Sequence, residues 1–114
     1  MLNELAQGVL AINKASGWGD KPHEVGTNLM LIVCELAEAM EADRKGIYAQ
    51  KDKYYKSKEA FEEYIKDSFE DEIADTIIRC LDLCARRGID IDFHVRAKLE
   101  YNKTRGYHHG GKAY

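Results

Sequence analysis

The sequence predicts a single all-α domain, a bundle of four helices with one further short helix. Apolar residues recur at spacings of three and four in four segments, which is the period of an amphipathic helix. Serine, aspartate and glycine residues stand at the expected starts and ends of those segments. One proline in 114 residues, Pro22, argues against a β-rich or disordered chain. We expect the domain to span 1–105 and a flexible basic tail to follow at 106–114.

The first two helices are long and end near glycines. The first is predicted over 3–15, with a stop at Gly17. A loop rich in turn formers follows. The second helix is predicted over 25–44 and ends at Gly46.

The middle of the chain contains a polar, tyrosine-rich stretch and then the third long helix. A loop and a short helix capped by Ser57 are predicted first. Ser68 then begins a capping box with Asp71 three residues later, which opens the third helix. That helix is expected to reach Arg87 and to stop at Gly88.

The fourth helix and the tail carry most of the positive charge. Either Asp90 or Asp92 is the predicted N-cap, and the helix is expected to end near Arg105. Five basic residues against Glu100 give 96–114 a charge of +4, so with a net charge of −3 the rest of the chain carries −7. An acidic body with a basic tail suits an anionic ligand that arrives with cations.

The second predicted helix has no continuous polar face through its middle. One apolar stripe is formed by Leu29, Ile32, Leu36 and Met40. The opposite side carries Leu31, Cys34 and Ala42. This pattern places the helix centrally in a bundle or against a second subunit. Glu35 and Glu38 interrupt it, and buried carboxylates persist only when they are paired or hold a metal.

The third helix offers a complementary acidic pair, Glu72 and Asp75, beside a predicted core stripe of Ile73, Ile77, Cys80, Leu81 and Cys84. If the second and third helices pack antiparallel, the two pairs converge. Four carboxylates supply the oxygen ligands that Mg²⁺ or Mn²⁺ prefers. The alternative is a solvated ion-pair face, because Arg79 follows Asp75, and Arg86 follows Asp82, at a spacing of four.

The order of these motifs resembles the MazG-like all-α nucleoside triphosphate pyrophosphohydrolases. The stretches "ELAE" and "EIAD" are similar to that family's ExxE and ExxD signature. Downstream, "KLEYNKTRGY" resembles its Lys, Asn and Arg run, here Lys98, Asn102 and Arg105. Upstream, Trp18 lies in a loop like the tryptophan-bearing loop of the family. The stretch 39–71 between the pairs is longer than in compact members.

The resemblance implies Mg²⁺-dependent hydrolysis of a nucleoside triphosphate between its α and β phosphates, giving a monophosphate and pyrophosphate. The metal ligands it implies are Glu35, Glu38, Glu72 and Asp75, and Mn²⁺ is a possible substitute for Mg²⁺. Glu38 is our candidate for the base that takes a proton from water.

The substrate contacts are expected to come from the last helix, the tail and the tryptophan loop. Lys98, Asn102 and Arg105 share one helix face and offer donors to phosphate oxygens. Trp18 is a candidate for stacking on the base, and Lys112 for a lid. The resemblance also implies a homodimer or homotetramer and a role in nucleotide-pool housecleaning.

Other classes are less well supported by the sequence. A ferritin-like di-iron protein needs Glu-x-x-His, which none of the four histidines provides. A zinc site from Cys80 and Cys84 lacks further soft ligands apart from Cys34. A non-catalytic helical oligomerisation or regulatory module with a structural metal site stays open. No signal peptide, membrane span or stable nucleic-acid binding is predicted, and three cysteines on predicted buried faces favour a reduced, cytoplasmic protein.

Overall fold

The computed structural model describes residues 1–18 and 24–106. Its elements are α1 (Leu2–Ala15), α2 (Val25–Arg44), the 3₁₀ helix η1 (Lys51–Lys53), α3 (Lys58–Tyr64), α4 (Phe69–Arg87) and α5 (Ile91–Lys103). Within these ranges there is no strand, which confirms the all-α class. The tail predicted at 106–114 lies outside the described residues from 107 onward. No helix in the described part of the chain is long and apolar enough to cross a membrane.

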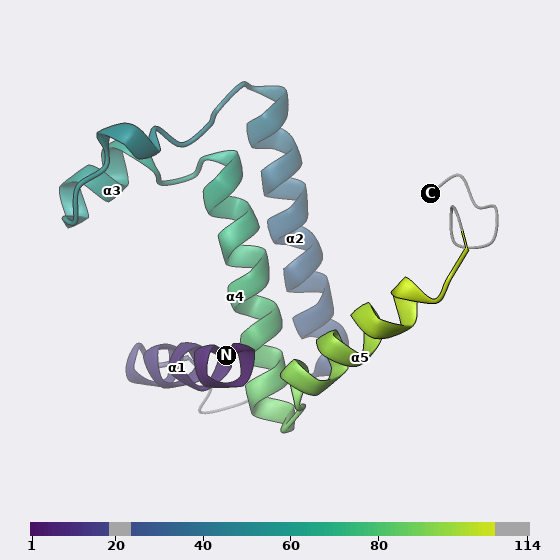
Figure 1. The fold of residues 1–114 in the computed structure, drawn as a ribbon. Coiled ribbons are helices and arrows are strands. Elements are labelled where there is room, and N and C mark those ends of the chain that lie inside the picture. Colours follow the sequence, from purple (N-terminus) through teal and green to yellow (C-terminus); the bar gives the residue numbers. More distant parts are fainter. Residues whose placement is uncertain (19–23, 107–114) are drawn as a thin grey trace.

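Helices α2 and α4 form an antiparallel pair at the centre of the fold (Figure 1). Helix α1 packs against α4, near the end where α4 finishes. Helix α5 starts at the same end and leads away from the pair, with its main contacts to α1. At the other end of the pair, η1 and α3 form a short arm, which contains most of the predicted insertion.

Most helix ends form as their cap residues predict. The Ser57 hydroxyl accepts a hydrogen bond from the Ala60 N–H at 3.0 Å and opens α3. Gly88 ends α4 with φ at 65°, a left-handed conformation that glycine adopts without strain.

The predicted capping box at α4 forms only in part. The Ser68 hydroxyl accepts from the Asp71 N–H at 3.2 Å, as expected. The Asp71 carboxylate does not return to the Ser68 N–H, because that group already donates to the Ile65 carbonyl. It accepts from the Asp67 N–H instead, at 2.9 Å.

The first turns of α1 and α5 cap each other. Asp90, one of two predicted N-caps, opens α5 by accepting from the Phe93 N–H at 3.1 Å. Asp92 instead crosses to α1, where its carboxylate accepts from the N–H groups of Leu2 at 2.9 Å and Asn3 at 3.0 Å. The hydrogen bonds from the N–H groups of Asn3 and Leu2 lower the pKa of Asp92 to about 2.

Asn3 completes this mutual capping of α1 and α5. Its side-chain oxygen accepts from the Ile91 N–H at 2.9 Å, and its side-chain amide donates to Asp90 at 2.8 Å.

We expect Asn3→Ala to lower the free energy of unfolding by about 1 kcal/mol, as the loss of a helix cap does. Urea unfolding measures this. Asn28→Ala is the control, because the Asn28 side chain makes no hydrogen bond within the described residues. Equal stability of Asn3→Ala and the wild type would contradict the capping role.

The core of the single chain is small. Its buried apolar residues are Ala6, Ile32, Ala39, Ala42, Ala60, Leu81 and Cys84. The Cα radius of gyration is 16.9 Å, whereas a compact domain of this length has about 13 Å. The accessible surface is 8926 Å², against about 6,300 Å² expected for 13.0 kDa. The chain is therefore much more open than its size requires.

An apolar stripe on α2 lies open to solvent. We call it the α2 stripe, and it consists of Val25, Leu29, Val33, Leu36 and Met40. Of the stripe predicted from the sequence only Ile32 is buried, because α4 covers just one side of α2.

The predicted core stripe of α4 and the predicted burial of the cysteines are also partly wrong. Leu81 and Cys84 are buried, but Ile77 is 52% exposed. Cys34 and Cys80 are exposed as well. The helices have the predicted apolar faces, but one chain does not supply enough neighbours to cover them.

Candidate metal centre

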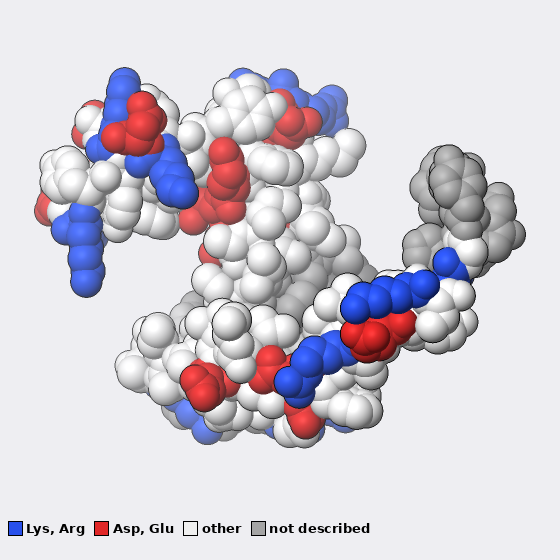
Figure 2. Space-filling model, in the orientation of Figure 1, with Lys and Arg blue, Asp and Glu red and all other residues white. Residues whose placement is uncertain are grey.

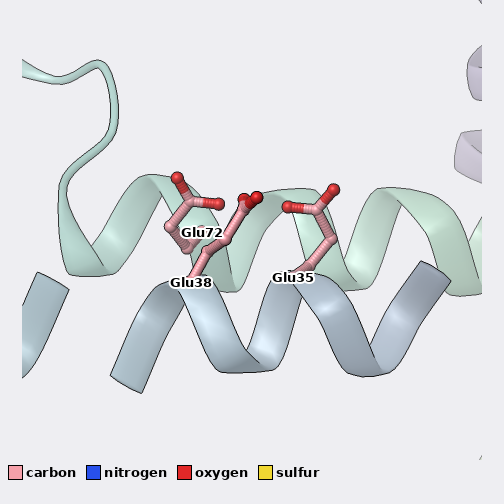
Figure 3. Close-up of side chains that lie close together, drawn as sticks. All are labelled: Glu35, Glu38 and Glu72. Atoms are coloured by element: carbon pink, nitrogen blue, oxygen red, sulfur yellow. The ribbon is translucent and has the colours of Figure 1, made fainter. Parts of the chain in front are cut away.

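Three of the four predicted acidic ligands come together between α2 and α4. Glu35 and Glu38 lie one turn apart in the middle of α2, and Glu72 lies in the first turn of α4. Each offers a carboxylate oxygen, and these oxygens all lie within 4.8 Å of one another. Figure 3 shows the carboxylates in a row, with Glu38 between the other two. The antiparallel packing of α2 and α4 produces this row.

Burial differs across the row and decides its electrostatics. Glu72 is buried, at 5% exposure, and its Oε2 has no hydrogen-bond partner among the described residues. Glu38 is exposed. Burial, reinforced by the carboxyl groups of Glu38 and Glu35 beside it, raises the pKa of Glu72 to about 8. Three carboxylates this close are unfavourable as three anions unless positive charge joins them.

Arg79 supplies part of that charge. Its Nε donates to Oε1 of Glu35 at 2.8 Å, across the interface between α4 and α2. Burial tends to raise the pKa of Glu35, but the hydrogen bonds with Arg79, Glu38 and Glu72 and the positive charge of Arg79 together outweigh it, so the net pKa is lowered. The ion pair of Arg79 with Asp75 that the alternative interpretation predicts does not form among the described residues, because Arg79 pairs with Glu35. The spacing of Glu72, Asp75 and Arg79 puts all three on one face of α4, and that face meets Glu35.

The other predicted ion pair on α4 does form. Arg86 Nε donates to Asp82 at 2.7 Å, one turn apart on the same helix. The face of α4 is therefore divided. Its C-terminal half has the ion pair of the alternative interpretation, although the Arg86 and Asp82 side chains are only 15% and 19% exposed, and its N-terminal half has the acidic row.

Asp75 lies beside the row without joining it. It is not one of the residues whose carboxylate oxygens lie within 4.8 Å of one another. Burial, followed by the negative charges of Asp71 and Glu35, raises its pKa. Asp75 thus contributes to the negative field of the site from one turn further along α4.

Two acidic residues outside the predicted ligand set lie next to the site. Asp67 and Asp71 place carboxylate oxygens within 4.8 Å of each other and of a Glu72 oxygen. The sequence predicts Asp71 only as a capping residue. The signal was available in the sequence, because Asp71 directly precedes Glu72 in the first turn of the same helix.

Trp18 lies far from the acidic row in the single chain. Its side chain is 66% exposed, and its carbonyl accepts from Arg86 Nη2 at 3.2 Å. Arg86 follows Glu72 by fourteen positions on α4, which is about 21 Å along a helix axis. The tryptophan is therefore at the opposite end of α4.

The predicted phosphate-binding residues lie on α5 and just beyond it, also away from the row. The Lys98 ammonium and the Arg105 guanidinium approach the Tyr101 ring, at 5.2 Å and 5.7 Å from its centre. Asn102 lines a shallow surface hollow, and its Oδ1 is buried without a partner in the described ranges. The fold separates this group from the carboxylates because α5 starts at the end of α4 that is remote from Glu72 (Figure 1).

The surface charge agrees with this separation. On the face shown in Figure 2, acidic side chains gather where the α3 arm meets the α2–α4 pair. Basic side chains lie on the α3 arm and along α5. Within the described part of the chain, two groups could hold a metal ion, and both consist of carboxylates alone. Such ligand sets suit hard divalent cations rather than zinc.

Comparisons of the chain with protein-family models, with curated proteins and with solved structures find no match.

Proposed function

We propose that the protein is a divalent-metal-dependent nucleoside triphosphate pyrophosphohydrolase, which cleaves between the α and β phosphates and releases a nucleoside monophosphate and pyrophosphate. The buried carboxylate of Glu72 carries this proposal, since its Oε2 has no partner and Glu35 and Glu38 lie beside it. The order of motifs shared with the MazG-like family supports the reaction type.

The residues fit Mg²⁺ or Mn²⁺. Glu35, Glu38 and Glu72 would hold the ion, with Asp75 one turn away to bind directly or through water. A bound ion of this kind supplies charge neutralisation of the triphosphate and lowers the pKa of a coordinated water.

The protein side chains have separate tasks in this proposal. Glu38 is exposed and central in the row, so it is the carboxylate best placed to accept a proton from the attacking water. Arg79 holds Glu35 in place through the bond between its Nε and the Glu35 carboxylate. Because the reaction needs positioning and charge stabilisation more than covalent chemistry, these are the roles that the site must fill.

The site needs a second copy of the chain to be complete. Within one chain, Lys98, Asn102 and Arg105 lie away from the carboxylates, although they are the donors proposed for the phosphates. The α2 stripe is uncovered, and the surface exceeds that of a compact chain by the order of 2,500 Å², enough for an obligate interface. A homodimer or homotetramer would cover this surface and bring basic residues of one copy to the acidic row of another.

The experiment is product analysis with canonical and modified NTPs and dNTPs, with and without Mg²⁺. We expect monophosphate and pyrophosphate only when Mg²⁺ is present. Glu38→Ala should lower kcat/KM at least about 100-fold, since it removes a ligand and the proposed base. Glu41→Ala is the matched control, because Glu41 lies one turn further along α2 and its ion pair within the described ranges is with Lys45, at 3.5 Å.

The alternative function predicts a different result. A non-catalytic helical oligomerisation or regulatory module would turn over no nucleotide and would be indifferent to the loss of Glu38. Absence of turnover by a folded, Mg²⁺-saturated protein across the whole panel would therefore overturn the hydrolase and favour the module.

A further inference from the structure

We propose that Asp67, Asp71 and Glu72 form a second cation position, next to the one between Glu35, Glu38 and Glu72 and sharing Glu72 with it. The proposal extends the proposed function through that shared residue. It concerns the binding of a divalent ion and does not depend on turnover.

The geometry brings two acidic groups to a single buried residue. Oxygens of Asp67 and Asp71 lie within 4.8 Å of each other and of a Glu72 oxygen, and so do oxygens of Glu35 and Glu38. Figure 3 shows one Glu72 oxygen turned toward Glu38 and the other turned away from it. A carboxylate that belongs to two groups of acids can bridge two cations, as in sites where two ions lie about 4 Å apart.

The unpartnered oxygen of Glu72 indicates that a ligand belongs here. Glu72 is only 5% exposed, so it is more than nine-tenths buried, and no described group donates a hydrogen bond to its Oε2. An ionised oxygen without a donor in such a place is costly unless a cation binds it. Arg79 is already bonded to Glu35 on the far side of the row.

The local hydrogen bonds account for only part of the acidic cluster. Asp71 Oδ2 accepts from the Asp67 N–H, so one Asp71 oxygen serves to close the turn before α4. No hydrogen bond or ion pair occupies the Asp67 carboxylate among the described residues. Asp67 also adopts φ of 62°, where asparagine is tolerated as well as aspartate. Its carboxylate can therefore be removed without disturbing the backbone.

The test is the number of Mn²⁺ ions bound per chain by the full-length protein, measured by calorimetry and by electron paramagnetic resonance without nucleotide. We expect two ions with an exchange-coupled spectrum in the wild type, and one ion with an uncoupled spectrum in Asp67→Asn. Glu70→Gln is the matched control, because it removes one charge from the same turn while its side chain still accepts from the Ala49 N–H. It should bind two ions.

One ion per wild-type chain, or two per chain in Asp67→Asn, would overturn the second position. Glu38→Ala then separates the two proposals. If the wild type binds one ion and Glu38→Ala loses it, the second position is overturned and the metal site of the proposed function stands. If the wild type binds no ion, both proposals are overturned.

Discussion

Glu72→Gln is expected to stabilise the metal-free protein and to abolish its response to Mg²⁺. The glutamine is nearly the same size as the buried glutamate but carries no charge, so it relieves repulsion from Glu35 and Glu38. We expect a gain of the order of 2 kcal/mol in the free energy of unfolding at pH 7.5 in EDTA. The same change should lower Mg²⁺-dependent hydrolysis at least about 100-fold.

The pH dependence has a defined sign. The pKa of Glu72 is raised in the folded protein, from 4.5 to about 8, so folding favours its protonated form. The associated stability is fully present below pH 4.5 and is lost as the pH rises toward 8. The free energy of unfolding of the metal-free wild type should therefore fall as the pH rises from 4.5 to about 8. The free energy of unfolding of Glu72→Gln should fall less over the same pH range.

Thermal unfolding at several pH values, with EDTA or with Mg²⁺, measures both parts of this prediction. Glu70→Gln again serves as the control, since Glu70 is exposed and outside the row. A Glu72→Gln protein that is less stable than the wild type in EDTA, or that keeps its Mg²⁺-induced stabilisation, would show that Glu72 is not the charged centre of the site.

Val33→Asp is expected to dissociate the protein into single chains. Val33 lies in the middle of the α2 stripe and is 50% exposed in one chain. If a second copy covers the stripe, the substitution buries an unpaired carboxylate in an apolar interface. We expect the dissociation constant to rise at least about 100-fold, equivalent to roughly 3 kcal/mol. Sedimentation or light scattering at micromolar concentration measures the assembly.

The control introduces the same type of charge elsewhere on the helix. Thr27→Glu adds a carboxylate to an exposed position of α2 that is well away from the stripe, so the assembly should persist. Hydrolysis should fall in Val33→Asp and not in Thr27→Glu if the phosphate-binding residues come from another copy. A wild-type protein that is monomeric at these concentrations would contradict the role of the stripe.

The helix boundaries could be predicted because their signals are local. Ser57, Ser68 and Gly88 each act within one turn of the chain, and each stands where the structure begins or ends a helix. The meeting of Glu35, Glu38 and Glu72 was also predictable. It follows from a spacing of three within each helix and from antiparallel packing of two long neighbours.

Features that depend on longer-range geometry were not predictable. The partner of Arg79 depends on how α4 is rotated against α2, and a spacing of four within one helix gave Asp75 instead of Glu35. The direction of α5 depends on the turn after Gly88 and on bonds to Asn3, almost the whole chain away. The sequence thus identified Lys98 and Arg105 as candidates without showing that one chain keeps them from the carboxylates.

The mutual capping of α1 and α5 has a consequence for how the chain folds. The bond between Asn3 and Asp90 joins residues 87 positions apart, and closing so long a loop carries a large entropic cost unless the intervening chain has already folded. We therefore expect the α2–α4 hairpin to form first and the junction of α1 with α5 to form late. During synthesis, the first turn of α1 must wait for its cap until Asp92 has left the ribosome.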